Sequence, residues 1–433
     1  MKSDAISGSL GTALLVMIFI TLALVPGGWA ATKYKVLHSF DGKDGVYTSS
    51  SLILDVSGNL YGTTFFGGAY GSGSVFQFTH SENGKWVEKV LHSFTGKDGY
   101  APGAGLSFDA AGNLYGTTTG GGAGCGGTGC GTVFELTPRS DGNWTERVLH
   151  SFGVGEDGSN PYAGVIFDAA GNLYGTTVNG GTSGSGCGGF GCGTVFELTP
   201  GSDGKWTETV LHNFVGSDGA QPWASLIIDP SGSLYGTTFR GGGPLCLGLG
   251  CGTVFRLTPK DKGKWTEVVL HSFAENHSDG TSPFSGLIFD TAGNLYGTTW
   301  LGGRNGDGTV FELSPDTNAP WKEKLLHSFN QKDGQAPFSG LILDGAGNLD
   351  GTTSYGGSYA SGTVFQLSRG TKGNWTEKVL HDFRAGGRDG VYPQADLVID
   401  AEGNMYGTTW FGGTFGSTCG NTDGCGTVFE ITP

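Results

Sequence analysis

One pattern occurs seven times along this chain. Each copy reads approximately Gly-Leu-Ile-x-Asp-x-x-Gly-Asn-Leu-Tyr-Gly-Thr-Thr, then a glycine-rich stretch, then Gly-Thr-Val-Phe-x-Leu-Thr-Pro, and finally Trp-x-Glu-x-Val-Leu-His-x-Phe. The histidine of each Leu-His pair recurs about every 57 residues, at His38, His92, His150, His212, His271, His327 and His381. A unit of this kind cannot bury its own apolar face, so the units must stack on one another.

Each copy contains four short runs rich in β-branched and aromatic residues, which predict four strands. In the second copy these strands are expected at residues 105–109, 113–118, 131–137 and 144–152. Gly112 and Gly142 can take the positive φ that the two hairpin turns require, and Pro138 is expected to end the third strand. No stretch after residue 40 has a sustained 3.6-residue apolar period, so no helices are expected.

The two ends of the repeat region are complementary fragments. Residues 426–433 read as a third strand without a fourth, whereas residues 33–40 read as a fourth strand without the first three. We therefore predict an all-β, seven-bladed β-propeller of four-stranded antiparallel blades over residues 31–433, with the N-terminal strand closing the last blade. A β-helix or open solenoid is the alternative, but it would need capping units instead of two complementary fragments.

The first 30 residues have the composition of a secretory signal peptide. There is no charge from Ala5 to Thr32, and an apolar run of 16 residues from Leu10 to Val25 precedes Pro26. This length is typical of a signal-peptide core, and we expect cleavage near Ala30; an uncleaved N-terminal anchor is the alternative. No segment after residue 40 is apolar enough to span a membrane.

The cysteines occur in four pairs, each in a loop between the second and third strands. Only the long loops, of 12, 15, 13 and 16 residues, carry a pair, while the three loops without cysteine have 8 residues each. A local bridge removes conformational freedom from a long glycine-rich loop, so we predict four disulfides and no zinc site. The predicted pairs are Cys125 with Cys130, Cys187 with Cys192, Cys246 with Cys251, and Cys419 with Cys425. Disulfides imply an oxidising compartment, so we expect a secreted or periplasmic protein.

The formal net charge of −15 and the lack of any basic run argue against nucleic acid and anionic membranes as partners. We expect a monomer that binds a glycan or an extracellular protein.

Three strings carry a resemblance to a known family: Leu-His-Ser-Phe, Gly-Asn-Leu-Tyr-Gly-Thr-Thr and Gly-Thr-Val-Phe-Glu-Leu-Thr-Pro. Together they resemble the tandem repeats of bacterial choice-of-anchor proteins of the GloVer (Gloeo-Verruco repeat) type, over residues 33–433. The resemblance implies a secreted bacterial repeat protein, usually with a surface-anchoring tail, and it brings no established activity. Because Pro433 directly follows a strand, free secretion or periplasmic retention is expected instead of surface attachment.

The histidines and two series of aspartates could carry chemistry, but each also has a structural interpretation. Strand alternation places Trp86, Glu88, Val90, His92 and Phe94 on one face, so each repeat histidine is expected between blades, bonded to a backbone or hydroxyl group. The aspartates of the first hairpins are expected to accept turn N–H groups: Asp55, Asp109, Asp168, Asp229, Asp290, Asp344 and Asp400.

The second aspartate series precedes glycine in the blade-to-blade loops: Asp44, Asp98, Asp157, Asp218, Asp279, Asp333 and Asp389. We interpret these Asp-Gly pairs as turns, with a calcium site as the alternative, and we predict no cofactor or metal. Asp350 replaces the tyrosine found in the other six copies, which we interpret as drift.

The second-to-third-strand loops and the blade-to-blade loops should emerge on one face, which carries the variation in length and the cysteines. Exposed aromatics follow Thr-Thr there and suit stacking on sugar rings, although they could instead pack under their own loops. The candidate ligand-binding residues are Phe65, Phe66, Phe239, Arg240, Trp300, Tyr355, Trp410 and Phe411. We predict a non-enzymatic binding or scaffold module. The alternative is a carbohydrate-active hydrolase or lyase that uses Asp279 and His277 near the axial mouth.

Overall fold

The computed structural model describes residues 32–432, apart from 126–128, 154–155, 182–186, 188, 244, 317–320, 387, 415–418 and 420–423. The chain divides into two units, Met1–Ala31 and Thr32–Pro433. The signal peptide proposed for residues 1–30 lies outside the described residues. The described part of the chain contains no helix that is long and apolar enough to cross a membrane.

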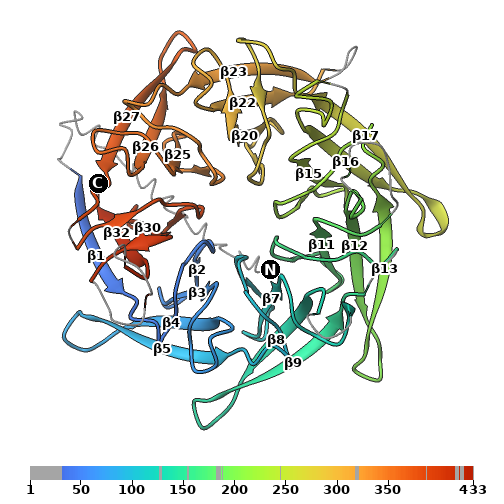
Figure 1. Cartoon of the computed structure of the whole chain (residues 1–433), viewed down its shortest axis with the longest axis vertical. Helices are drawn as coiled ribbons and strands as arrows, with labels where there is room; N and C mark the ends of the chain where they lie inside the picture. Colours follow the sequence, from blue (N-terminus) through green and yellow to red (C-terminus); the bar gives the residue numbers. More distant parts are fainter. Residues whose placement is uncertain are drawn as a thin grey trace, which may run out of the picture. The chain divides into compact units, whose positions relative to one another are not determined.

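The second unit is a seven-bladed β-propeller whose blades are four-stranded antiparallel sheets (Figure 1). Blade 1 consists of β2 (Ile53–Leu54), β3 (Leu60–Thr64), β4 (Ser74–His80) and β5 (Trp86–Ser93). Blade 2 consists of β6 (Ser107–Phe108), β7 (Leu114–Thr118), β8 (Thr132–Pro138) and β9 (Trp144–Ser151). Blade 3 consists of β10 (Ile166–Phe167), β11 (Leu173–Thr177), β12 (Thr194–Pro200) and β13 (Trp206–Asn213). Blade 4 consists of β14 (Ile227–Ile228), β15 (Leu234–Thr238), β16 (Thr253–Pro259) and β17 (Trp265–Ser272).

The last three blades follow the same plan. Blade 5 consists of β19 (Ile288–Phe289), β20 (Leu295–Thr299), β22 (Thr309–Ser314) and β23 (Lys322–Ser328). Blade 6 consists of β24 (Ile342–Leu343), β25 (Leu349–Thr353), β26 (Thr363–Arg369) and β27 (Trp375–Asp382). Blade 7 consists of β29 (Val398–Ile399), β30 (Met405–Thr409), β32 (Thr427–Thr432) and β1 (Lys33–Ser39). The shorter elements are β18 (Gly280–Thr281), β21 (Leu301–Gly302), β28 (Gly390–Val391), β31 (Phe411–Gly412) and the 3₁₀ turn η2 (Asp261–Gly263).

The predicted closure of the ring is confirmed. Strand β1 pairs antiparallel with β32, from Lys33 opposite Thr432 to Ser39 opposite Thr427. The four strands predicted for the second copy are also present, although the innermost one, β6, is shorter than expected, with two residues. Gly112 and Gly142 take positive φ values of 84° and 79°, as their hairpin turns require.

The first hairpin of each blade is fastened by its aspartate. In blade 2, Asp109 Oδ1 accepts the N–H groups of Ala111 and Asn113, and Oδ2 accepts the Asn113 amide and the Tyr115 hydroxyl. This confirms the structural role predicted for these aspartates. In blade 6 the tyrosine is replaced by Asp350, a fully buried side chain that accepts a hydrogen bond from Gln366.

A β-bulge in the outer strand corrects one prediction. The pairing of β4 with β5 shifts at Leu91, because Val75 lies opposite His92 while Phe76 lies opposite Val90. The extra residue reverses the alternation. Trp86 therefore packs on the preceding blade, whereas Leu91 and Phe94 pack on the following blade. The expectation that residues 86, 88, 90, 92 and 94 share one face is wrong, and the same register shift occurs in all seven blades.

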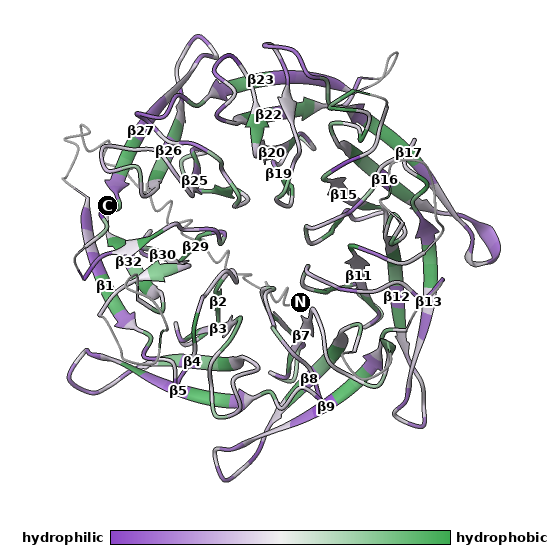
Figure 2. Cartoon of the chain, in the orientation of Figure 1, coloured by the Kyte–Doolittle hydropathy of each residue, from purple (hydrophilic) through white to green (hydrophobic). Residues whose placement is uncertain are grey.

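The core consists of apolar layers between neighbouring blades. Between blades 1 and 2, for example, Phe94 of blade 1 meets Phe134 of blade 2 with ring centroids 5.1 Å apart. Figure 2 shows hydrophobic residues along the strands and hydrophilic residues in the outer hairpins. Each blade is thus held by its neighbours, which gives the loops at the axis a rigid support.

Candidate functional site: the axial pocket

The two predicted sets of loops do meet on one face. The blade-to-blade loops pair with the second-to-third-strand loops through short antiparallel bridges, such as Val46 with Phe66 and Tyr100 with Gly120. In blades 5 and 7 these bridges extend to the two-residue ladders of β18 with β21 and β28 with β31. The loops therefore brace one another around the axis.

A cavity of about 260 Å³ lies at the axis and is lined by residues from all seven blades. Its volume is close to the lower end of the roughly 300–1,000 Å³ range of small-molecule sites. A cavity of this size suits one ring-sized group. We refer to it as the axial pocket.

One side of the axial pocket is an arc of aromatic rings from blades 3 to 6. The rings belong to Tyr162, Trp223, Phe284 and Phe338, each of which directly follows a proline. Successive ring centroids are 4.4, 5.1 and 4.9 Å apart, so the four rings are in continuous contact. All four side chains are half-buried. Their exposed parts offer a continuous apolar surface to a ligand.

The other side of the axial pocket comes from blades 7, 1 and 2 and carries polar or small residues beside the rings of Phe65 and Trp410. The residues that take the place of the aromatics there are Gln394, Ser49 and Gly103. Asp396 is the one charged side chain among the described lining residues. Burial raises the pKa of its carboxyl group, while the Gly340 N–H and the Ser51 hydroxyl oppose that increase.

Two of the candidate residues, Phe65 and Trp410, line the axial pocket, with ring centroids 5.7 Å apart. Phe239 and Trp300 stack on each other behind the arc, with a centroid distance of 5.8 Å, and they contact Phe284 and Phe338. Both are half-buried, so they partly support other rings instead of facing solvent alone.

The remaining candidates are not among the residues that line the axial pocket. The Arg240 guanidinium lies 5.7 Å from the Phe239 ring centroid. Phe66 contacts Tyr47 at its ring edge, and Phe411 contacts both Tyr47 and Tyr392. Tyr355, which is 41% exposed, packs against Tyr392.

The aromatic arc was not predicted from the sequence, where the candidates were the residues after Thr-Thr. The position after the proline, whose place Thr48 takes in the first copy, is aromatic in four copies and polar or glycine in three. That variation could have identified these positions as candidates for a ligand site.

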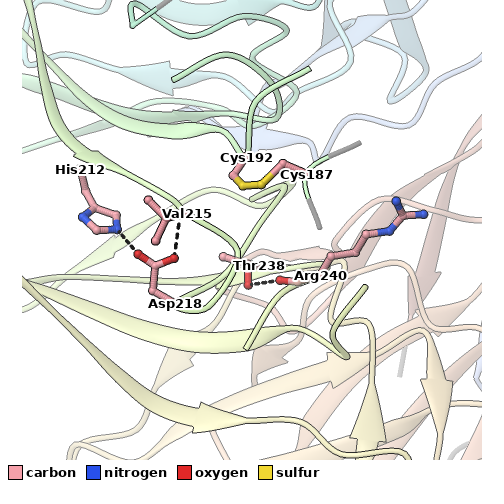
Figure 3. Close-up of a disulfide and its surroundings, with 7 residues drawn as sticks. All are labelled: Cys187, Cys192, His212, Val215, Asp218, Thr238 and Arg240. Carbon is pink, nitrogen blue, oxygen red and sulfur yellow. Dashed lines mark hydrogen bonds and ion pairs between the residues drawn. A yellow bond between two sulfur atoms is a disulfide. The ribbon is translucent and has the colours of Figure 1, made fainter. Parts of the chain in front are cut away.

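The disulfides support the loops of this face as predicted. The four predicted cysteine pairs are all bonded, and no described cysteine is free. Figure 3 shows Cys187–Cys192 near the blade-to-blade loop that carries Asp218, which contacts His212 of β13. Four disulfides are typical of proteins outside the cytoplasm.

The repeat histidines lie between blades, as predicted, but their partner is a carboxylate and not a backbone or hydroxyl group. His92 Nε2 lies 3.0 Å from Asp98 Oδ2, and Asp98 also accepts the Thr95 N–H. Burial raises the pKa of Asp98, but the hydrogen bonds from His92 and Thr95 outweigh this effect and lower the pKa to about 2. The Asp-Gly aspartates are thus turn residues and histidine partners at once.

The bulge brings a glutamate of the next blade to each of these pairs. The Glu146 carboxylate lies beside His92 and Asp98, with one oxygen or nitrogen of each residue within 4.8 Å of the others. Burial raises the pKa of Glu146 to about 7, and its Oε1 has no hydrogen-bond partner among the described residues. We call such a trio a Glu–His–Asp cluster. At five other interfaces the equivalent glutamate interacts electrostatically with the His–Asp pair, and we include these as clusters, so that the six glutamates are Glu88, Glu146, Glu208, Glu267, Glu323 and Glu377.

The seventh interface replaces glutamate by tyrosine. Tyr34 stacks on His381 with ring centroids 3.7 Å apart. Burial, together with the charge of Asp389, raises the pKa of Tyr34. The near-uniform recurrence around the ring favours a structural role over metal binding for these clusters.

The residues proposed for the hydrolase alternative are not at the axial mouth. Asp279 is buried, contacts His271 and accepts the Ala274 N–H, and it does not line the axial pocket. His277 is exposed in the same loop and does not line the pocket either.

Comparisons with known proteins agree with the repeat pattern. The Gloeobacter/Verrucomicrobia repeat family matches residues 27–188 and 187–417. The chain belongs to this repeat family. No curated protein matched the chain.

Among solved structures, the repeat protein is similar to a crystal structure described as a putative oxidoreductase (glucose dehydrogenase) from Thermus thermophilus. The two share 14% identity over 93% of this chain and 100% of that one, with a TM-score of 0.45. A similarity of this size says nothing about the activity of this chain.

Proposed function

We propose that this protein is a secreted or periplasmic, non-enzymatic binding module that takes one sugar ring of a glycan into the axial pocket. The observation that carries the proposal is the continuous arc of Tyr162, Trp223, Phe284 and Phe338 around a cavity of about 260 Å³. Sugar rings have apolar faces that stack on aromatic side chains, and their hydroxyls need polar partners at the edge.

The polar side of the pocket supplies such partners. Ser49, Ser51 and Gln394 lie opposite part of the arc, and the Nε1–H of Trp223 has no hydrogen-bond partner among the described residues. No cofactor or metal is part of the proposal.

A carbohydrate-active enzyme remains the second candidate, but the pocket supports it less well. Glycoside hydrolysis generally uses two carboxyl groups about 5–10 Å apart. The described lining residues include only one, Asp396.

The test is a glycan array with the purified protein, followed by titration calorimetry of the best ligand and a reducing-end assay on polysaccharides. Trp223→Ala should weaken binding about 10- to 100-fold, the effect of losing an aromatic anchor worth about 1–3 kcal/mol. Tyr70→Ala removes an aromatic ring that is 67% exposed and outside the pocket lining, so it should leave affinity unchanged. Equal losses in the two variants would contradict the axial site, and turnover that disappears in Asp396→Asn would favour the enzyme.

A further inference from the structure

Asp396 breaks the sevenfold symmetry at the axis. It lies two residues before the first strand of blade 7, and the equivalent residues of the other blades are small. These equivalents are Ser51, Gly105, Gly164, Ser225, Gly286 and Gly340. A carboxylate therefore enters the axial pocket from one blade only.

The position of Asp396 is fixed by its two neighbouring blades. Its Oδ1 accepts the N–H of Gly340 in blade 6, and its own N–H donates to Ser51 Oγ of blade 1 at 3.2 Å. Gly340 has no side chain, and a Cβ there would lie 3.0 Å from Asp396 Oδ1. The absence of a side chain at residue 340 is what lets the carboxylate occupy this place.

The same contact exists elsewhere in the ring with a neutral residue. Ser225 of blade 4 accepts the N–H of Gly164 in blade 3 at 3.0 Å. A serine therefore satisfies the same backbone donor without a charge. The carboxylate at Asp396 adds something that the fold itself does not need.

What it adds is an acidic group beside aromatic rings. Burial raises the pKa of Asp396, and none of the described lining residues is cationic, so its ionised form lacks a countercharge until a cation binds. A buried carboxylate without a countercharge is unfavourable, and a cationic ligand relieves that penalty. The faces of Trp223 and Trp410 also attract cations through their ring quadrupoles.

We propose that the axial pocket selects a sugar that carries a free, protonated amine, with Asp396 as the partner of the ammonium group. This inference rests on the proposed function, because it specifies which class of sugar the aromatic arc holds. The ammonium group donates to Asp396, while the apolar face of the sugar ring lies on the arc.

The experiment compares glucosamine, glucose and N-acetylglucosamine by titration calorimetry on the full chain, near neutral pH. Glucosamine should bind at least tenfold more tightly than the two neutral sugars. In Asp396→Ser this preference should disappear, with a loss of about 10- to 100-fold for glucosamine, the factor expected for a hydrogen bond to a charged group. Affinity for glucose should change less than threefold.

The serine variant is a matched control for folding, because it reproduces the Ser225–Gly164 contact that the chain already uses. Asp396→Asn keeps the shape of the side chain and should also lose the preference. Equal affinity of the wild type for glucosamine and glucose would overturn the inference and leave the proposed function standing. If none of the three sugars binds, the inference is wrong, and the glycan array then decides separately whether the proposed function stands. If tetramethylammonium, with no sugar ring, binds as tightly as glucosamine, the inference is also wrong, because the pocket then selects a simple organic cation.

Discussion

The glutamates of the Glu–His–Asp clusters predict that the propeller is more stable in mildly acidic than in mildly alkaline solution. Burial raises the pKa of Glu146 from its ordinary 4.5 to about 7, with His92 lowering it and Asp98 raising it further. Between these two values the folded protein keeps a proton that the unfolded chain has released. The stabilisation is therefore complete below about pH 4.5 and is lost as the pH rises through 7.

The magnitude follows from the size of the pKa change. A rise from 4.5 to about 7 corresponds to at most about 3.4 kcal/mol, at 1.36 kcal/mol per pKa unit. Six glutamates with this full effect would contribute about 20 kcal/mol, more than the roughly 5–15 kcal/mol that stabilise a whole domain. Glu146 is half-buried, so solvent screens part of its charge, and we expect about 1–2 kcal/mol for one residue.

The perturbation is Glu146→Gln, which keeps the shape of the side chain but cannot ionise. Urea unfolding followed by tryptophan fluorescence should show a variant about 1–2 kcal/mol more stable than the wild type at about pH 8, and close to the wild type at about pH 5. The control is Glu82→Gln, because Glu82 is exposed in the outer hairpin turn of blade 1. A stability difference for Glu146→Gln that is the same at both pH values would refute the reasoning.

In strong acid the free energy of unfolding should instead fall as the pH falls. The pKa of Asp98 is lowered to about 2, so its contribution is present above its ordinary value of 3.8 and is lost as the pH falls towards 2. Together the two effects place the stability maximum at about pH 4–5.

Three further predictions concern the ring, the loops and blade 6. Replacing both Cys246 and Cys251 by Ser should lower the free energy of unfolding by about 1–3 kcal/mol and leave the circular dichroism spectrum unchanged, because the bridge closes a short loop; a loss of the fold would contradict this. Deleting residues 32–40 should expose the edge of β32 and cause aggregation, measured by light scattering, whereas a monodisperse deletion variant would argue against closure by β1. Asp350→Asn should stabilise the protein by about 1–3 kcal/mol at about pH 8 and less at about pH 5, since burial raises the pKa of Asp350 to about 7 and its Oδ2 has no partner among the described residues; no gain in urea unfolding would count against this.

Most of the fold could be predicted from the sequence because it depends on local patterns. The turn glycines, the strand composition and the complementary end fragments each indicate a blade without reference to distant contacts. The bulge at Leu91 could not be predicted, since an extra residue in a strand leaves the apolar pattern almost unchanged. That one residue decides which blade His92 faces, and so the Glu–His–Asp clusters were not foreseen either.

The site was less predictable, for a geometric reason. Phe65 and Trp410 were among the candidates and line the axial pocket, but the arc depends on the residues after the prolines. The seven loops meet there only once the ring closes. The pairing of His92 with Asp98 is reflected in the sequence, because the same spacing of six residues between histidine and aspartate recurs in several copies. Strand alternation alone cannot reveal that the two side chains meet.

The pairing of β1 with β32, which closes the ring, affects the order in which the strands fold. Six blades form from strands that are adjacent along the chain, but β1 must wait for β32, about 400 residues away. Contacts over such a separation form late, because the chain between them must first be ordered. Until then β1 is unpaired, and the ring is open between blades 7 and 1. The stack of Tyr34 on His381 ties β1 to blade 6, so this aromatic pair can seat the strand before its hydrogen bonds with β32 are complete. Hydrogen exchange should accordingly find that β1 opens first and most often. Because Tyr34 stays neutral well above pH 7, this interface should not be weakened by the ionisation that affects the glutamates at the other six interfaces.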